Sequence, residues 1–210
     1  GVVAAPLRDF AGVDAIIVAV PAGQAAAILE EIAQRGTDAR VVIDTGSTKA
    51  SIVGAASKLS IADRFVGCHP LAGDHRCGWA ASRKGLFDGA RVFLCATATT
   101  SYDALRAAEA LWNEVGGRTE RVGAAGHDER IARTSHLPHV LSTALAHAMA
   151  ASGIERRELG RGGRDMTRLA ASSAEVWTDI CLDNAPALTA ALATCGEALS
   201  RLTLALEQGN

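Results

Sequence analysis

His69 is the residue whose type and position most favour chemistry. It lies in the stretch Phe65-Val66-Gly67-Cys68-His69-Pro70-Leu71-Ala72-Gly73. The stretch begins as a buried strand at residues 64–66, and the two glycines and the proline that follow are expected to end it. Ligands of open parallel sheets bind outside the carboxyl ends of the strands, where side chains point into a crevice. An imidazole there titrates near neutral pH and could accept a proton during a reaction, although a lone histidine can also simply cap a loop.

Ser47 and a pair of histidines are further candidates. Ser47 lies in Asp44-Thr45-Gly46-Ser47-Thr48-Lys49, directly after another apolar run, where its hydroxyl could act on a ligand or cap the next helix. His136 and His139 have a metal-ligand spacing on a helix, but no carboxylate or thiol partner is obvious, so we expect no metal site. We interpret His139 as structural, and His127 and His147 as solvent-facing or packing residues.

Short apolar runs bounded by turn residues predict the strands that would position His69 and Ser47. They occupy residues 14–20, 40–44, 64–66 and 90–95, with a possible edge strand at 118–122. Helical patterns separate them at residues 24–35, 47–59 and 103–115. Strands alternating with helices over short connections predict an α/β fold with a parallel, doubly wound sheet.

The chain after Gly126 carries no further strand pattern, which predicts an all-helical region. A long helix is expected over residues 127–152, with a kink or break near Leu137 because Pro138 follows it. A Gly/Arg-rich connection at residues 156–165 and helices at 166–171, 174–182 and 186–207 come next. The last helix carries a heptad-like seam that could pack within the chain or form a homodimer contact: Leu188, Leu192, Cys195, Leu199, Leu202 and Leu206. We therefore predict two domains, residues 1–123 and 124–210.

Composition restricts the possible partners and compartment. The formal net charge is -2 and there is no basic run, so nucleic acid and anionic membrane surfaces are not expected partners. No apolar run approaches the roughly 18 to 20 residues that span a bilayer. The five cysteines are scattered and form no CxxC pair, which favours reduced thiols and a cytoplasmic location.

Five motifs together resemble, in order and spacing, the prephenate/arogenate dehydrogenase family of tyrosine biosynthesis. They are Asp44–Lys49, Gly67–Gly73, Ser135–His139, Arg164-Asp165-Met166-Thr167-Arg168-Leu169-Ala170 and Trp177. The resemblance implies a Rossmann-like nucleotide-binding domain, an all-α C-terminal dimerisation domain and NAD or NADP as cofactor. It also implies the reaction: hydride leaves the ring of prephenate or arogenate, the ring loses CO2, and 4-hydroxyphenylpyruvate or tyrosine forms.

The resemblance also implies roles for individual residues. His69 would accept the proton of the substrate hydroxyl, and Ser47 would bond to His69 or to that hydroxyl. Arg168 would bind a substrate carboxylate, unless it only pairs with Asp165 at the surface, and Trp177 would line the pocket or serve as a core aromatic. His136, His75 and Gly73 complete the expected substrate contacts. The expected cofactor contacts are Val20, Pro21, Gly46 and Ser47.

Two departures from the family pattern concern substrate choice. After Gly73 the family usually has Ser or Thr and then Glu, whereas this chain has Asp74-His75-Arg76-Cys77-Gly78, with His75 in place of the acid. The segment Arg161-Gly162-Gly163-Arg164 lacks the family's usual phenylalanine. These changes leave open prephenate, arogenate or a modified, for example amino-substituted, analogue.

The chain also starts at Gly1 and contains no GxGxxG phosphate-binding fingerprint. We expect it to be a Rossmann-like domain without its first part. One alternative is a β-hydroxyacid-type dehydrogenase, which would be expected to use a helical lysine, and no lysine follows Lys84. The other is a non-catalytic remnant that dimerises or binds a ligand.

Overall fold

A computed structural model describes residues 10, 12–73 and 82–209. The chain divides into two compact units, one ending at His127 and the other beginning at Asp128. The first unit holds a sheet and the second is helical in its described residues. This confirms the predicted fold class, whereas the boundary between residues 123 and 124 stays a prediction.

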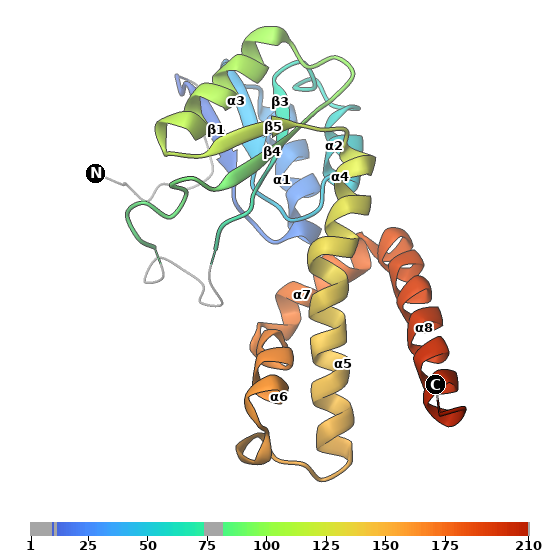
Figure 1. Ribbon diagram of the computed structural model, residues 1–210. Coiled ribbons are helices and arrows are strands. Elements are labelled where there is room, and N and C mark those ends of the chain that lie inside the picture. The colour runs from blue at the N-terminus through green and yellow to red at the C-terminus, as the bar shows by residue number, and fades with distance from the viewer. Residues whose placement is uncertain (1–9, 11, 74–81, 210) are drawn as a thin grey trace. The chain divides into compact units, whose positions relative to one another are not determined.

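The first unit contains a five-stranded sheet in the order β1-β2-β3-β4-β5 (Figure 1). The strands are Ala15–Val18, Val41–Asp44, Phe65–Pro70, Arg91–Ala96 and Arg118–Arg121. Its helices are α1 (Ala22–Arg35), α2 (Ala50–Ala56) and α3 (Tyr102–Glu114). Strands β1, β2 and β3 run parallel, so their carboxyl ends meet at one edge of the sheet.

Apolar side chains on both faces of the sheet explain why the strands read as continuous apolar runs. On one face, Val42 and Phe65 pack with Leu29 of α1 and Ile52 of α2. On the other face, side chains that alternate with these along the same strands pack with α3. The second set includes Val41, Ile43, Val66, Cys68, Ala108 and Trp112. The helical layers can be followed in Figure 1.

One strand direction differs from the predicted parallel sheet. β4 runs antiparallel to β3, with Gly67 opposite Cys95 and His69 opposite Phe93, whereas β5 is parallel to β4. A parallel neighbour requires a crossover, usually a helix, and α3 supplies one between β4 and β5. The described residues between β3 and β4 contain turns and no helix, and the two strands are antiparallel.

The expected break in β3 at Gly67 is also wrong, because the strand continues to Pro70. A Cβ atom at Gly67 would lie 2.9 Å from Cγ2 of Val53 and 3.2 Å from the carbonyl oxygen of Cys95. Glycine at this position therefore allows a close approach of neighbouring groups to the strand, which is a common reason for glycine inside a sheet. His69 is the penultimate residue of β3 and still lies close to its carboxyl end.

The second unit begins within α4 (Ala124–Ile131), and the predicted kink takes the form of a π-helical segment. That segment is Ala132–His136, and α5 (Leu137–Ala151) follows it directly. The N–H of Leu137 donates to the carbonyl of Ala132, the spacing of a π turn. Pro138 has no N–H to donate and its ring collides with the preceding turn of an ordinary helix, so a wider turn accommodates it.

Two short turns and three helices complete the described part of the helical unit. The Gly/Arg-rich connection contains a 3-10 turn, Arg156–Glu158, and α6 (Arg161–Met166). A second 3-10 turn, Arg168–Ala171, α7 (Ala174–Asp183) and α8 (Ala185–Glu207) follow. In the described residues, no helix combines the length and apolarity needed to cross a membrane.

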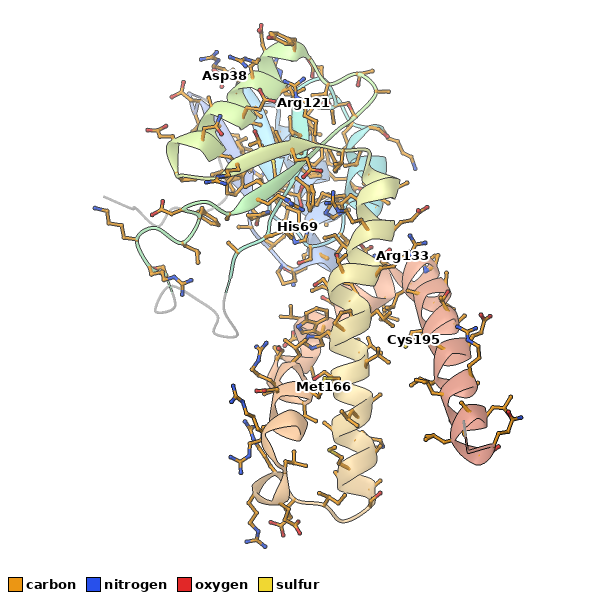
Figure 2. The ribbon with its side chains drawn as sticks, in the orientation of Figure 1. Asp38, His69, Arg121, Arg133, Met166 and Cys195 are labelled. Carbon is orange, nitrogen blue, oxygen red and sulfur yellow. The ribbon has the colours of Figure 1, made fainter. Side chains whose placement is uncertain are left out.

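The seam on α8 is packed at one end and open at the other. Leu188 is buried, and Cys195, midway along the helix in Figure 2, is partly buried. Beyond it the exposed fraction is 54% at Leu199, 62% at Leu202 and 80% at Leu206. The seam therefore packs within the chain only over its first half.

Candidate active site

His69 forms the centre of a buried group of rings at the end of β3. Its Nδ1 lies 2.9 Å from Nε2 of His127, which belongs to the first turn of α4. Phe93 on β4 contacts the edge of the His127 ring, with centroids 5.3 Å apart, and also faces His69. All three side chains are buried. Figure 2 labels His69 within the sheet unit. His69 is thus held by a second histidine rather than simply ending a loop.

Of the two interpretations of His127, the solvent-facing one is wrong and the packing one is confirmed, because its ring is buried against His69 and Phe93. Its side chain is 1% exposed and forms a hydrogen bond with His69 across 58 residues of sequence. The only local signal is the dipeptide His127-Asp128 at the start of a helix, which does not point to a partner on a distant strand.

A buried carboxylate connects the turn that carries Ser47 to the strand that carries His69. Asp44, the last residue of β2, accepts hydrogen bonds on Oδ2 from the backbone N–H of Gly46 and from the Lys49 ammonium group. Its Oδ1 accepts from the N–H of Cys68 at 3.0 Å. Asp44 therefore joins the end of β2 to the residue that precedes His69.

Both members of the Asp44–Lys49 ion pair are almost completely removed from solvent. Burial raises the pKa of the Asp44 carboxyl group, and the Lys49 ammonium group and the two backbone N–H groups oppose that rise. Burial also raises the pKa of the neighbouring Cys68 thiol, which keeps it protonated and unreactive. The sequence does not reveal this ion pair, because lysine is rarely buried and residues 44–49 have the composition of a solvent-exposed turn.

Ser47 and the predicted cofactor residues lie in two neighbouring turns. Helix α2 begins at Ala50 and its N-cap is Lys49, so Ser47 does not cap that helix. Gly46 and Ser47 follow β2 and are half-buried. Val20 and Pro21 follow β1, and Pro21 is the N-cap residue of α1. Because β1 and β2 are parallel neighbours, these four residues come from one edge of the sheet.

His136 and Trp177 come together within the helical unit. His136 lies on the π segment, and its Nδ1 is 3.2 Å from the side-chain nitrogen of Asn184. Trp177 on α7 meets the His136 ring edge-on, and the His139 ring stacks on Trp177 with centroids 3.4 Å apart. Desolvation lowers the pKa of His139. A π turn is often found at functional sites, and this one carries His136.

A pocket of about 550 Å³ lies between α5 and α7. Trp177 and His139 line it, together with mainly apolar side chains of both helices. Among the described residues, no group of three histidine, cysteine, aspartate or glutamate side chains could hold a metal ion.

Two predicted substrate residues, Arg168 and Gly73, lie at exposed positions within their own units. Arg168 begins a 3-10 turn and its side chain is exposed. Among the described residues, Asp165 forms a long ion pair with Arg161, with 3.9 Å between Nε and Oδ2, rather than with Arg168. Gly73 is exposed, with a φ of 146° that disfavours any other residue. His75 lies outside the described residues.

Comparison with known proteins assigns both units to one family. Residues 3–121 match the prephenate dehydrogenase nucleotide-binding domain, and residues 123–210 match the prephenate dehydrogenase dimerization domain. The chain is 34% identical over 175 residues to prephenate dehydrogenase of Bacillus subtilis, covering 80% of this chain and 47% of that protein. It is also 34% identical over 182 residues to cyclohexadienyl dehydrogenase of Zymomonas mobilis, and this match covers 83% of this chain and 61% of that protein. The chain thus spans about half the length of the curated relatives it matches.

Solved structures give the same result for the fold. Prephenate dehydrogenase from Aquifex aeolicus, in complex with hydroxyphenyl propionate and NAD+, has a TM-score of 0.86 and 28% identity, covering 93% of this chain and 70% of that one. Arogenate dehydrogenase of Synechocystis has a TM-score of 0.81 and 26% identity, and the match covers 94% of this chain and 73% of that one. With both units matched along nearly their whole length, the chain belongs to the prephenate dehydrogenase family.

Proposed function

We propose that the protein containing this chain is an NAD(P)-dependent dehydrogenase that oxidatively decarboxylates prephenate or arogenate. Family membership supports the reaction class, and relatives in the family are named for prephenate, cyclohexadienyl and arogenate substrates. The observation that carries the proposal is the buried His69–His127 pair at the carboxyl edge of the sheet. A carbinol that loses hydride must also lose its hydroxyl proton, and a held imidazole at this edge can accept that proton.

The proton taken by His69 would be returned within the same turnover. As hydride leaves the ring carbon, the O–H bond breaks and His69 holds the proton. When the carboxylate leaves as CO2, its bonding electron pair makes the ring aromatic, and the former carbonyl oxygen takes a proton to become a phenol. Ser47, in the turn joined to the His69 strand through Asp44, would bond to the same hydroxyl.

Residues of the helical unit would recognise the substrate's carboxylates and side chain. Arg168 is exposed on a short turn, and a guanidinium group is suited to binding a carboxylate through two parallel hydrogen bonds. His136 and Trp177 offer a hydrogen-bonding ring beside an apolar face. Gly73 and His75 would contribute from the residues that follow β3, where His75 stands in place of the glutamate usual in the family.

The turns after β1 and β2 fit a nucleotide, because open α/β sheets bind nucleotides outside the carboxyl ends of adjacent strands. Val20, Pro21, Gly46 and Ser47 would hold the cofactor there. When bound, NAD(P)+ supplies the acceptor for hydride. The glycine fingerprint that binds a pyrophosphate is not among these 210 residues, so none of them is assigned to that group.

The family match and the exposed seam of α8 support a homodimer through the helical unit. The exposed leucines in the second half of its seam would be covered by a second copy. Sedimentation of the parent and of a Leu202→Glu/Leu206→Glu variant tests this proposal. The parent should sediment as a dimer and the variant as a folded monomer; a monomeric parent would contradict it. A cytoplasmic location stays a prediction.

Formation of reduced cofactor tests the activity. The full-length protein is offered prephenate or arogenate with NAD+ or NADP+ in four separate reactions. Turnover with one pair supports the proposal and identifies the substrate and cofactor together. If a folded protein forms no reduced cofactor in any of the four reactions, the result would favour a substituted substrate analogue or a non-catalytic role.

A further inference from the structure

The hydrogen bond between His69 and His127 constrains where the proton on each ring can lie. A neutral imidazole has one N–H donor and one bare nitrogen that accepts. Nδ1 of His69 and Nε2 of His127 are 2.9 Å apart, so one of these two atoms donates and the other accepts. Two arrangements are therefore possible, and they differ in whether Nε2 of His69 can accept a proton.

In the first arrangement, His69 donates from Nδ1, and its Nε2 carries the lone pair. In the second, His127 donates from Nε2, so Nδ1 of His69 accepts and its Nε2 carries a hydrogen. Only in the first arrangement can His69 take a proton at Nε2, because in the second the base nitrogen is occupied by the contact with His127. The proposed reaction requires the first arrangement. The choice between the two arrangements therefore rests on the proposed function.

The surroundings hold the His127 ring in place. His127 lies in the first turn of α4, where its backbone N–H donates to the carbonyl of Gly123 at 2.8 Å. The His127 ring meets both the His69 ring and the Phe93 ring edge-on, with centroid distances of 5.1 and 5.3 Å. Phe93 is itself 1% exposed and lies opposite His69 in the strand register. A ring fixed by its helix and by Phe93 presents Nε2 at a constant position.

We propose that His127 is a positioning residue that accepts a hydrogen bond from Nδ1–H of His69 and so keeps Nε2 of His69 available as the base. When the substrate O–H bond breaks, a new N–H bond forms at Nε2, and Nδ1–H continues to donate to His127. Because His127 neither gains nor loses a proton, it need not touch the substrate. Its contribution is to orient the His69 ring and to select its tautomer.

Nitrogen NMR of the histidine rings tests the tautomer without any need for activity. Ring nitrogens with and without hydrogen have well-separated 15N chemical shifts, and a His69→Asn variant identifies the His69 signals. In the folded parent protein, His69 should carry its hydrogen on Nδ1 and His127 on its own Nδ1. A hydrogen on Nε2 of His69 in the parent would overturn the inference, whatever the enzyme does.

Two substitutions at His127 test the consequence for catalysis. His127→Leu removes the acceptor, whereas His127→Gln places an amide oxygen near the position of Nε2. His127→Leu should lower kcat on the order of tenfold to a hundredfold, change KM less than about threefold, and increase the kinetic isotope effect of ring-deuterated substrate. His127→Gln should recover most of kcat and keep the hydrogen of His69 on Nδ1.

The possible outcomes separate this inference from the proposed function. An active parent with Nδ1–H on His69, together with loss in the leucine variant and recovery in the glutamine variant, supports both. An active parent whose kcat is unchanged in His127→Leu overturns the positioning role only. Equal loss in the leucine and glutamine variants overturns it as well, because retention of an acceptor then makes no difference. A folded parent that is inactive in all four reactions overturns the proposed function, and the NMR result still decides the tautomer.

Discussion

His69 and Arg168, the two residues proposed to act most directly on the substrate, have contrasting surroundings. His69 is buried on a central strand, bonded to His127, and follows a residue anchored by the buried Asp44. Arg168 is exposed on a one-turn 3-10 helix. A group that must accept a proton benefits from fixed geometry, because its reaction partner has to be met at a defined distance and angle. A group that only attracts a carboxylate tolerates a long, solvated side chain.

The contrast predicts that changes in the sheet unit affect turnover and folding, whereas changes near Arg168 affect substrate binding.

The largest expected effect follows from removal of the base, His69. His69→Asn should lower kcat by about 10²- to 10⁴-fold, with KM within a few-fold, because the proton acceptor acts mainly in the transition state. Steady-state kinetics of the full-length enzyme measure both constants. A rise in KM with unchanged kcat would remove the distinction between the two residues.

The next effect concerns the buried ion pair. Lys49→Met should lower the free energy of unfolding by about 3–5 kcal/mol, because it leaves the Asp44 carboxylate buried without its cation. Urea denaturation measures the change. Arg35→Gln is the matched control, since it breaks the exposed Glu31–Arg35 pair and should cost less than about 0.5 kcal/mol. Similar losses in the two variants would show that Asp44–Lys49 is no more than a surface-type pair.

A smaller effect is expected at Arg168. Arg168→Gln should raise KM by about ten- to a hundredfold, because the amide can keep one hydrogen bond to the carboxylate but loses the charge-assisted contact, a loss of roughly 1.5–3 kcal/mol. Its kcat should change little, and its urea midpoint should match the parent because the side chain is exposed. Arg164→Gln on α6, also exposed, is a control for the general loss of one positive charge. Equal KM changes in both variants would point to long-range attraction rather than a specific contact.

The smallest effect is a pH dependence in the helical unit. Desolvation lowers the pKa of His139 in the folded protein, so the unfolded chain binds a proton more readily as the pH falls. The free energy of unfolding should therefore fall as pH decreases from 7 towards 5. His139→Gln and His139→Phe should both flatten that slope, and the phenylalanine variant keeps a ring against Trp177. Urea titrations at several pH values measure the slope, and an unchanged slope in both variants would rule out His139 as its source.

Local patterns were sufficient for most of the fold. Continuous apolar runs predict β1 to β4 within a few residues, because strands covered on both faces of a sheet are rich in apolar side chains. The edge strand β5, Arg118–Arg121, is polar and has no such run. The change from alternating strands and helices to helices alone predicted the two kinds of unit. Five ordered motifs were enough to indicate the family, which the matches to both of its domains confirm. The roles of His69, Ser47, His136, Arg168 and Trp177 stay predictions.

Three features depended on contacts between distant residues, and no local pattern carries them. The apolar run of β4 is equally compatible with a parallel and an antiparallel neighbour, and only the pairing shows that it runs antiparallel to β3. Lys49 can be buried because its ammonium group pairs with Asp44. Asp44 in turn accepts a hydrogen bond from the backbone of Cys68 on β3, 24 positions later in the sequence. His127, 58 positions after His69 in the sequence, meets it only because the start of α4 lies at the end of β3. Residue types and periodicity determine which segments are strands and helices, whereas a side chain's partner depends on how those segments pack against one another.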